Sequence, residues 1–328
     1  MILAGDIGGT KVNLALYEAG GRGLECRVIE TYPSRDYSSL REIVKLFLEA
    51  HSAKVDCACF GIAGPVRNGR AQPTNLSWIA DVRELITLLN LEKVWLINDL
   101  EANAYGIQEL APDKLVELNR GSGINGNLAI ISAGTGLGEA GLLWDGRRHL
   151  VIPSEGGHSD FGPRTDLDVE LLGYFRARFG QVSWEHVLSG AGSFHIYQFL
   201  RDSGRGTEPA WLAEEMKQND PAAVITKAAL ENKCGLCVQA LDLFTRYYGA
   251  EAANLALKMF AIGGVYVGGG IAPKIIEKIK DGTFMKAFIG EGRMKDLLAT
   301  IPVRVILDDK TALIGAAHYA AAQSGKIS

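Results

Sequence analysis

Amphipathic helical patterns alternate with buried apolar runs along the first hundred residues, and this alternation restricts the chain to an α/β fold. Residues 39–51 carry apolar side chains at helical spacing, and residues 55–62 form a continuous apolar run that is typical of a buried strand. A second pair follows, in which Asp81 is the predicted N-cap of a helix over 85–89 and residues 94–97 form the strand. We therefore predict sheets flanked by helices.

Strand-like runs separated by glycine-rich turns open the chain and indicate an antiparallel meander, so the central sheets are predicted to be mixed. These runs are residues 2–5, 12–17 and 25–31. After Asp166 the pattern becomes mainly helical. Further helices are predicted at residues 167–179, 193–200, 221–230 and 232–260, at Pro273 and at 311–323, and further strands at 128–132, 265–268 and 303–307.

Two domains are expected, because 328 residues of which 47% are apolar can bury more than one core. A stretch rich in Gly, Ser and Asn, residues 119–127, follows the first α/β region. We predict a small domain over residues 1–105 together with the C-terminal helix 311–328. The large domain is predicted over residues 106–310.

Charge and cysteine content exclude several classes of function. A formal net charge of -4 gives no general attraction for nucleic acid or for anionic lipid, so neither is an expected partner. The N-terminal residues lack a basic region and reach Asp6 after few apolar ones, which is unlike a signal peptide or a membrane span. Five cysteines, an odd number, indicate reduced thiols, and a cytoplasmic location is expected. Cys234 and Cys237 lie in a helical pattern without a partner pair, so we interpret them as packed thiols rather than as zinc ligands.

Glycine clusters stand at the ends of predicted strands: Gly5–Thr10, Ala133–Gly138 and Gly268–Gly270. Such turns can hold phosphate with backbone N–H groups, but glycine equally serves tight turns and close packing. The first two clusters are followed by a strand rather than by a helix, which is unlike a dinucleotide-binding or P-loop motif.

Asp6 and Thr10 frame the first of these turns. A carboxylate that faces nucleotide phosphates needs a divalent cation between them, and Mg²⁺ held through water fits that role. The alternative for Asp6 is a bond to nearby backbone amides that shapes the turn. For Lys11, a phosphate contact and a solvated strand position are both open.

Asn98 and Asp99 follow a predicted strand directly, at the edge where open α/β sheets form ligand sites. An aspartate with the ordinary pKa of about 3.9 is ionised at neutral pH and can accept a proton. The alternative is that Asp99 caps the helix that follows it. Glu155 and His158 could likewise be solvated loop residues, and Glu185 could lie on an exposed helix face.

Together the motifs resemble those of bacterial glucokinases of the zinc-free branch, in the superfamily of hexokinases and actin-like ATPases. The resemblance rests on motifs in the order of that family: Gly5–Thr10, Ile97–Ala102, Gly134–Gly138, Glu155–Phe161, Glu185–Gly190 and Gly268–Pro273. It implies two α/β domains of the ribonuclease H-like type with an interdomain cleft. It also implies a cytoplasmic enzyme of glycolysis, a homodimer, that uses ATP and Mg²⁺ to phosphorylate the 6-hydroxyl of D-glucose to glucose 6-phosphate.

The resemblance also assigns roles to individual residues. Asp99 is expected to be the catalytic base, and Asn98, Glu155, His158 and Glu185 are expected to bind the sugar. The expected nucleotide-binding residues are Asp6, Gly8, Gly9, Thr10, Lys11, Gly134, Thr135, Gly136, Ser189, Gly190, Gly268, Gly269 and Gly270. The chain departs from the family at Lys11, where many members carry Asn, and at Ala191, where Pro is expected.

Two alternative functions remain open from the sequence. A non-catalytic sugar sensor would need the sugar ligands but neither Asp99 nor the phosphate turns. A kinase for another hexose, or one that uses ADP or polyphosphate as donor, would share all of these motifs.

Overall fold

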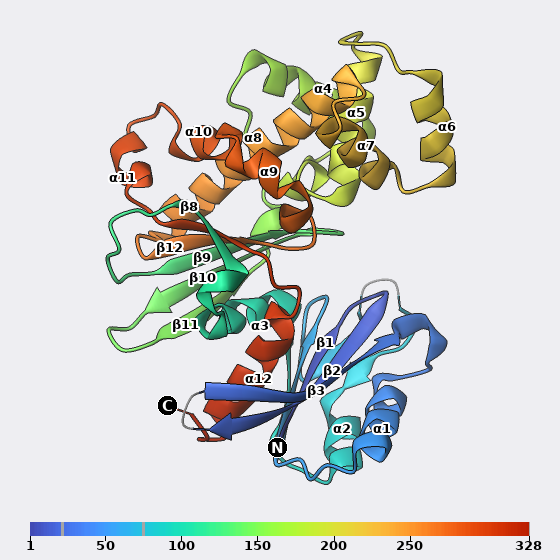
Figure 1. Cartoon of the computed structure of the whole chain (residues 1–328), viewed down its shortest axis with the longest axis vertical. Helices are drawn as coiled ribbons and strands as arrows, with labels where there is room; N and C mark the ends of the chain where they lie inside the picture. The colour runs from blue at the N-terminus through green and yellow to red at the C-terminus, as the bar shows by residue number, and fades with distance from the viewer. Residues whose placement is uncertain (21–22, 74–75, 328) are drawn as a thin grey trace. The chain divides into compact units, whose positions relative to one another are not determined.

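The structure, a computed structural model, describes residues 1–20, 23–73 and 76–327. The chain divides into two compact units, Met1–Lys114 with Asp308–Ser328, and Leu115–Leu307. Each unit contains its own mixed sheet flanked by helices, so the predicted α/β fold is confirmed (Figure 1). Among the described residues, no helix has both the length and the apolar character needed to cross a bilayer.

The sheet of the first unit has the strand order β3-β2-β1-β4-β7. Its strands are β1 (Ile2–Ile7), β2 (Lys11–Gly20), β3 (Gly23–Pro33), β4 (Cys57–Ile62) and β7 (Val94–Asn98). β1, β2 and β3 form the antiparallel meander predicted from the sequence, whereas β4 lies parallel to both β1 and β7. A short separate ladder joins β5 (Arg70–Ala71) to β6 (Ala80–Asp81).

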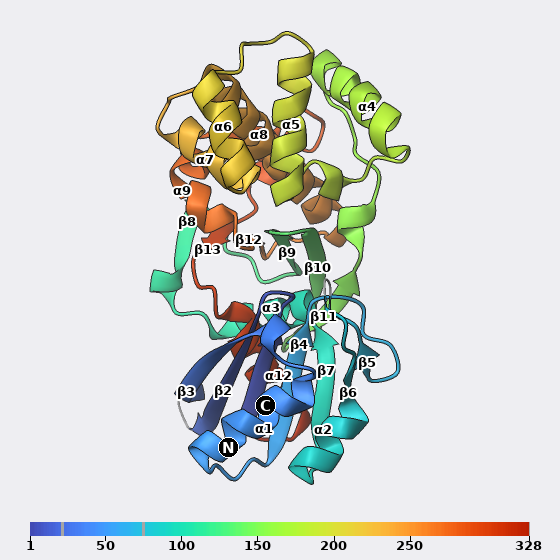
Figure 2. The same cartoon turned by 90° about the vertical axis from the view of Figure 1, so that its right-hand side faces the viewer.

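Each face of this sheet is covered by a pair of helices (Figure 2). Side chains of α1 (Leu40–His51) and α2 (Val82–Leu89) pack with Leu3, Ile7 and Phe60, while α3 (Asp99–Gly106) and α12 (Thr311–Gln323) pack with Ile2 and Ala4. Successive strand residues point to opposite faces, so β1 contributes to both cores. Ser39 and Asp81 are the N-cap residues of α1 and α2. Ser39 Oγ accepts from Glu42 N at 3.2 Å, and Asp81 Oδ1 accepts from Arg83 N at 2.9 Å.

Glycines bring α3 and α12 unusually close together. A Cβ on Gly315 would lie 2.5 Å from Gly106 N and 2.8 Å from Ala102 C, and a Cβ on Gly106 would lie 2.9 Å from Thr311 C. Real Cβ atoms essentially never approach other heavy atoms closer than 3.0 Å. The backbones of the two helices are therefore in direct contact.

The division into units differs from the one predicted at residues 105 and 310. Residues 106–114, which include the 3₁₀ helices η2 (Ile107–Glu109) and η3 (Pro112–Lys114), belong to the first unit, as do residues 308–310. The physical reason is contact with α12: Gly106 packs against Thr311, and His318 Nδ1 lies 2.7 Å from Glu109 Oε1.

The sheet of the second unit has the strand order β11-β10-β9-β12-β13-β8. These strands are β8 (Leu115–Asn119), β9 (Leu128–Ala133), β10 (Leu137–Trp144), β11 (His149–Ser154), β12 (Gly264–Gly268) and β13 (Val303–Ile306). β9, β12 and β13 are parallel, and the outer strands β8, β10 and β11 are antiparallel to their neighbours.

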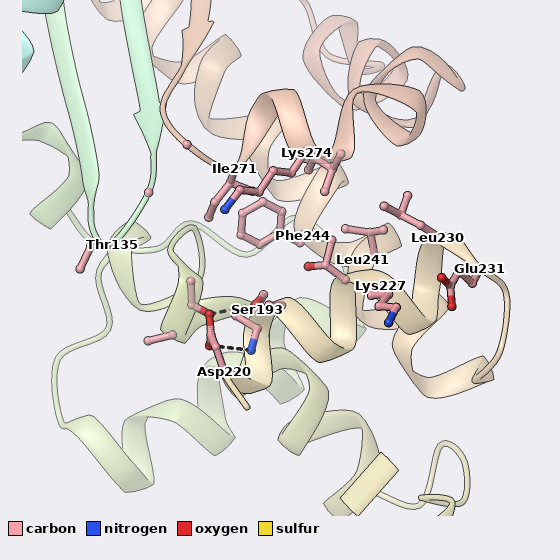
Figure 3. A pocket seen from close by; sticks show the side chains of 18 residues that line it. Thr135, Ser193, Asp220, Lys227, Leu230, Glu231, Leu241, Phe244, Ile271 and Lys274 are labelled. Carbon is pink, nitrogen blue, oxygen red and sulfur yellow. Dashed lines mark hydrogen bonds between the residues drawn. The ribbon is translucent and has the colours of Figure 1, made fainter. Parts of the chain in front are cut away.

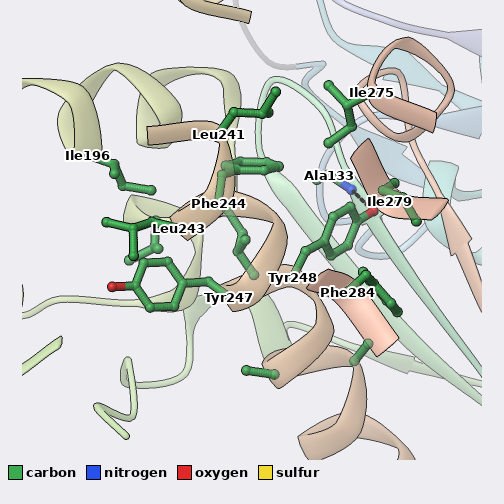
Figure 4. Close-up of a cluster of buried hydrophobic side chains, with 14 of the residues drawn as sticks. Ala133, Ile196, Leu241, Leu243, Phe244, Tyr247, Tyr248, Ile275, Ile279 and Phe284 are labelled. Carbon is green, nitrogen blue, oxygen red and sulfur yellow. Dashed lines mark hydrogen bonds between the residues drawn. The ribbon is translucent and has the colours of Figure 1, made fainter. Parts of the chain in front are cut away.

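The longest helix of this unit is α8 (Gly235–Met259), which is mostly buried. The others are α4 (Asp166–Phe179), α5 (Gly190–Asp202), α6 (Ala210–Gln218), α7 (Pro221–Leu230), α9 (Ile276–Lys280), α10 (Thr283–Ile289) and α11 (Lys295–Ala299). Figure 4 shows the aromatic side chains of α8 within the core, where Ala133 N donates to Tyr248 Oη at 3.0 Å and Tyr248 Oη donates to Gly268 O at 2.8 Å. Tyr248 therefore ties the ends of β9 and β12, the strands that precede two glycine clusters, to the core.

The cysteines are free thiols, and Cys234 and Cys237 are buried at the first turn of α8, where Cys234 is the N-cap residue. Burial, as its first cause, raises the pKa of Cys237. The burial of both thiols agrees with the prediction that they are packed in the interior.

Candidate active site

A chain of hydrogen bonds fixes Asp6 at the end of β1. Asn13 Nδ2 donates to Asp6 Oδ2 at 3.0 Å, and Thr31 Oγ1 donates to Asn13 Oδ1 at 2.8 Å. Asn13 is fully buried and lies opposite Asp6 in the β1–β2 register. Burial raises the pKa of Asp6, while the bond from Asn13 and the nearby charges of Lys11 and Lys310 lower it. A partly desolvated carboxylate of this kind gains from a cationic partner.

The turn between β1 and β2 is held from one side by Ser34. Gly8 N donates to Lys11 O at 3.0 Å, Ser34 N donates to Thr10 O at 3.0 Å, and Ser34 Oγ donates to Gly8 O at 2.7 Å. Thr10 and Lys11 are exposed, and Lys11 Nζ lies 3.7 Å from Asp309 Oδ2. The carbonyl oxygens of Gly8 and Thr10 are thus engaged, and the turn presents exposed hydroxyl and ammonium groups.

Asn98 and Asp99 mark the passage from β7 to α3. Asn98 is the N-cap: its Oδ1 accepts from Leu100 N at 2.9 Å and from Glu101 N at 3.3 Å, and its Nδ2 donates to Gly64 O at 3.0 Å. The alternative that Asp99 is the cap is therefore wrong, because Asn98 holds that position. An amide nitrogen carries two hydrogens, so Asn98 retains one for a ligand.

Asp99 is the first residue of α3, half-buried, with Oδ1 accepting from Leu100 N at 2.9 Å. The first turn of a helix suits an acidic side chain, because the helix dipole is positive at that end. Gly61 of β4 permits this placement, since a Cβ there would lie 2.8 Å from Ala102 Cβ and 3.6 Å from Asp99 Cα.

The structure brings the three predicted sugar ligands of the second unit together around the start of β10. Glu155 precedes the 3₁₀ helix η4 (Gly156–His158), and Glu185 lies in the 3₁₀ helix η5 (Trp184–His186). Glu185 Oε2 accepts from Leu137 N at 2.9 Å, and His158 Nδ1 lies 3.9 Å from Glu185 Oε1. The side chains of His158 and Glu185 are 60% and 35% exposed, so both remain accessible to a ligand.

Backbone contacts lock these two 3₁₀ helices to β10 and to each other. His158 N donates to Glu155 O at 3.0 Å, and Trp184 N donates to Ser159 O at 3.0 Å. A Cβ on Gly157 would lie 3.0 Å from Leu137 C and closer still to its oxygen, so only glycine fits beneath the loop. Glu155 and His158 are exposed, so the alternative that they are solvated loop residues stays open, as does an exposed helix face for Glu185. The side chains of His158 and Glu185 nevertheless lie close together.

A pocket of about 740 Å³ lies beside this cluster in the second unit (Figure 3). It is lined by four residues of the predicted nucleotide set, Gly134, Thr135, Gly190 and Gly270. Gly190 N donates to Gly134 O at 2.9 Å and Ile271 N donates to Ala133 O at 3.2 Å, so three glycine-bearing segments meet there. Its walls come from α5, α7, α8 and the 3₁₀ helix η6 (Ala272–Ile275).

Other predicted nucleotide residues support the pocket rather than line it. Ser189, which is buried, is the N-cap of α5, where it accepts from Gly192 N at 3.1 Å and donates to Glu185 O at 2.8 Å. A Cβ on Gly136 would lie 2.5 Å from Glu185 Oε2, and a Cβ on Gly269 would lie 2.7 Å from Ala133 C. The carbonyl of Gly268 accepts the bond from Tyr248.

Several lining residues were not identified from the sequence. Figure 3 shows Lys227 and Lys274 at opposite sides of the pocket, with Phe244 between them and Ile271 beside Lys274. Asp220, the N-cap of α7, also lines the pocket. They lie in or beside helices that were predicted, but no short motif marks the face that a helix turns toward a ligand. Lys310, next to the first turn of α12, was likewise missed as a charge near Asp6.

Comparisons with known proteins agree on one family. A family model described as glucokinase matches residues 3–323. A glucokinase of a Nostoc species is 44% identical, with 98% of this chain and 99% of that protein covered, and one of a Synechocystis species is 42% identical, with 97% of each covered. The crystal structure of a glucokinase from an Antarctic psychrotroph matches with a TM-score of 0.87 and 32% identity over 98% of both chains.

A more distant solved structure shares the fold at 21% identity. It is a ROK family glucokinase from Streptomyces griseus in complex with glucose and AMPPNP, with a TM-score of 0.65 over 98% of this chain and 99% of that one.

Proposed function

This chain belongs to the glucokinase family, and from that premise we propose that it transfers the terminal phosphoryl group of ATP to the 6-hydroxyl of glucose, with Asp99 as the base. The observation that carries the assignment of Asp99 is its place at the first turn of α3, where the Ile97–Ala102 motif sets a half-buried carboxylate beside the N-cap Asn98. Matches at 42–44% identity over nearly the whole chain support glucose as the sugar.

The proposed chemistry requires little covalent participation by the protein. Asp99 orients the 6-hydroxyl of glucose and accepts its proton as the oxygen attacks the phosphorus of the terminal phosphate. The bond from that phosphorus to the bridging oxygen breaks, and ADP and glucose 6-phosphate leave. Asp99 Oδ1 accepts a hydrogen bond from Leu100 N, which helps to orient the carboxylate for this role.

Glu155, His158 and Glu185 are proposed to bind the other sugar hydroxyls, together with the remaining N–H of Asn98. Sugar hydroxyls both donate and accept, so carboxylates and an imidazole match them. Glu185 Oε2 is bound to Leu137 N, which orients Oε1 toward His158. A sugar that lacks one of these hydroxyls would leave its polar partner in the closed site unpaired and would therefore bind less well.

The pocket of about 740 Å³ is proposed to hold the nucleoside of ATP. Its size falls in the range of ordinary ligand pockets, and Phe244 and Ile271 provide apolar contact for a base while Lys227 and Lys274 add positive charge. Thr10, Lys11 and Gly134 are proposed to contact the phosphates.

Mg²⁺ is proposed to be held near Asp6, chiefly by the phosphates and by water. Among the described residues, no group of three His, Cys, Asp or Glu side chains is arranged to hold a metal. Mg²⁺ bound to nucleotides normally uses one or two carboxylates, so a single oriented Asp6 fits this ion. When bound, the ion would neutralise charge that develops on the phosphates.

The assembly and location of the enzyme are also proposals. A homodimer follows from the resemblance to bacterial glucokinases, and a cytoplasmic location is supported by the free thiols and the free Cys26 on the surface.

The experiment that tests the function compares the wild type with Asp99→Asn. Phosphorylation of a panel of hexoses is measured with ATP, ADP and polyphosphate as donors, and glucose binding is measured by calorimetry. We expect wild-type turnover of glucose with ATP, a loss of about 100-fold or more in kcat for Asp99→Asn, and glucose affinity changed by no more than about twofold.

Asp113→Asn is the matched control, because Asp113 is exposed in the same unit and its substitution should leave kcat unchanged. Glucose binding without turnover in the wild type would instead favour the sugar sensor. Preferred turnover of another hexose or donor would replace glucose or ATP in the assignment.

A further inference from the structure

Two carboxyl groups are buried side by side behind the predicted sugar-binding loop. Glu139 in β10 and Glu251 in α8 are 1% and 0% exposed. Their side chains are within hydrogen-bonding reach of each other. Glu139 Oε1 is buried and has no hydrogen-bond donor among the described residues.

The surroundings supply too little positive charge for two carboxylates. From α8, Lys258 Nζ lies 3.4 Å from Glu251 Oε1 and Asn254 Nδ2 donates to Glu251 Oε2 at 2.7 Å. The side chain of Lys258 is 52% exposed, so solvent weakens its effect. Arg164, in the segment before α4, also attracts the charge of Glu251, but its guanidinium donates to Ala250 O and Ala287 O.

The strands beside Glu139 contribute no further charge. In the register of the sheet it lies between Ile131 of β9 and Ser154 of β11. Tyr248, the other titratable group of α8 near Glu139, donates its hydroxyl to Gly268 O. Two carboxyl groups in such a site cannot both ionise at neutral pH.

One proton shared by the two carboxyl groups removes one negative charge and gives Glu139 Oε1 a hydrogen-bond partner. A protonated Glu139 donates a hydrogen bond to Glu251 instead of facing it as a second acceptor. Burial, as its first cause, and the charge of Glu251 raise the pKa of Glu139 to about 8. The pair therefore retains its proton at neutral pH and loses it in the alkaline range.

The carboxyl group of Glu139 directly supports the loop that carries Glu155 and His158. A Cβ on Gly156 would lie 3.1 Å from Glu139 Cδ and closer still to Oε2, so the loop backbone rests on this carboxyl group. Gly156 N donates to Ser154 Oγ at 2.8 Å, which fixes the loop from the adjacent strand. A second negative charge at Glu139 would repel Glu251 and displace this support.

We propose that Glu139 and Glu251 share one proton and, through Gly156, position Glu155 and His158 for glucose. This inference rests on the proposed function. Glu139 and Glu251 are positioning residues, since they act through the loop. Loss of the proton raises the KM for glucose. The value of kcat at saturating glucose changes less, because the proposed base Asp99 is not part of the loop that rests on Glu139.

The test measures KM and kcat for glucose between pH 6.5 and 9.5 in wild type, Glu139→Gln and Glu251→Gln. Above a pKa of about 8, the wild-type KM should rise about tenfold per pH unit, reaching roughly 30-fold at pH 9.5. Glu139→Gln retains a donor but cannot ionise, so its KM should stay within about threefold over this range. Glu251→Gln should also remove the rise, because one carboxylate beside an amide needs no proton. Glu117→Gln, at an exposed position in the same unit, should behave like the wild type.

A second measurement needs only the wild type. Glucose binding at pH 8.5 is followed by calorimetry in two buffers of different ionisation enthalpy, and we expect uptake of a fraction of a proton. An equal alkaline rise of KM in wild type and Glu139→Gln, or glucose binding without proton uptake, would overturn the inference while leaving the glucokinase activity intact. Absence of glucose turnover at pH 7 would refute the proposed function instead.

Discussion

Replacing Gly315 by Ala should destabilise the first unit, although the same change in most helices is stabilising. Ala exceeds Gly in helix propensity by about 1 kcal/mol at interior positions. In α12, however, the new Cβ would lie 2.5 Å from Gly106 N, 2.8 Å from Ala102 C and closer still to Ala102 O. These are backbone atoms of α3, so no side chain can rotate away.

The magnitude follows from the separation that the helices would need. Moving the Cβ to an ordinary distance of at least 3.0 Å from every atom requires a shift of roughly 1 Å between α3 and α12. Overpacking of this kind costs about 1–3 kcal/mol, and the rigid backbone places this site at about 3. After the gain of about 1 kcal/mol in propensity, we expect a net loss of about 2 kcal/mol in the free energy of unfolding.

The same shift should reduce catalysis. Ala102 lies one turn from Asp99 on α3, and Gly61 of β4 leaves no room on the other side. Misplacement of a catalytic group by about 1 Å can lower the rate by about 100-fold. We therefore expect kcat for glucose to fall by about 10-fold or more, with ATP affinity little changed.

Hydrogen exchange read by mass spectrometry measures the stability of each unit separately, through amides of α3 and α12 for the first and of α4 for the second. Gly173→Ala is the matched control: Gly173 is an exposed helical glycine of α4 with no atom within 4 Å of an added Cβ, so it should gain about 1 kcal/mol. If Gly315→Ala is stabilised as much as Gly173→Ala, the close packing of α3 on α12 is wrong. Unchanged kcat in a destabilised variant would contradict the link to Asp99.

Two further predictions concern the second unit. Because Glu139 has a pKa near 8 in the folded chain and an ordinary one when unfolded, the folded state binds more protons between about pH 4.5 and pH 8. As the pH rises through that window, the free energy of unfolding of the wild type should therefore fall relative to that of Glu139→Gln by up to about 1.4 kcal/mol per pH unit. Urea unfolding at a series of pH values measures this difference. A difference that stays constant with pH would refute the prediction. Gly270→Val should raise the KM for ATP by about 10-fold without loss of stability. Gly270 lines the pocket, and nothing lies within 4 Å of a Cβ added there. An unchanged KM for ATP would argue against nucleotide binding at this site.

The elements that could be predicted from the sequence are those with a strong period or a buried apolar run. Helices over 221–230 and 311–323 have the predicted bounds, and the strand at 55–62 begins only slightly later, at Cys57. β11 was missed, because it is an edge strand with exposed apolar residues and Pro153, which weakens a strand pattern. β8 was missed because its residues are only partly buried and its pattern is short.

Some residues of the candidate site could likewise be identified from the sequence, and others could not. Asp99, Glu155 and His158 stand in compact motifs after strands, and these could be found by motif and resemblance. Glu139 directly follows the motif Gly134–Gly138, yet a charged residue in a predicted strand normally points to solvent, and no local pattern indicates that it faces Glu251 more than a hundred residues later. Contacts of this kind depend on tertiary packing, which periodicity does not describe.

Glycine illustrates why the sequence motifs could not separate ligand contacts from packing. Gly270 has open space where a side chain would be, and so does Gly134, where the nearest atom to an added Cβ is Gly270 N at 4.0 Å. At Gly269 and Gly157 the same atom would collide with the backbone of Ala133 or Leu137. Adjacent glycines of one cluster therefore have different roles: Gly270 leaves room for a ligand, whereas Gly269 holds the turn against β9 and thereby keeps that room open. A substitution at Gly269 would distort the wall of the pocket, whereas a substitution at Gly270 can report on what the pocket binds.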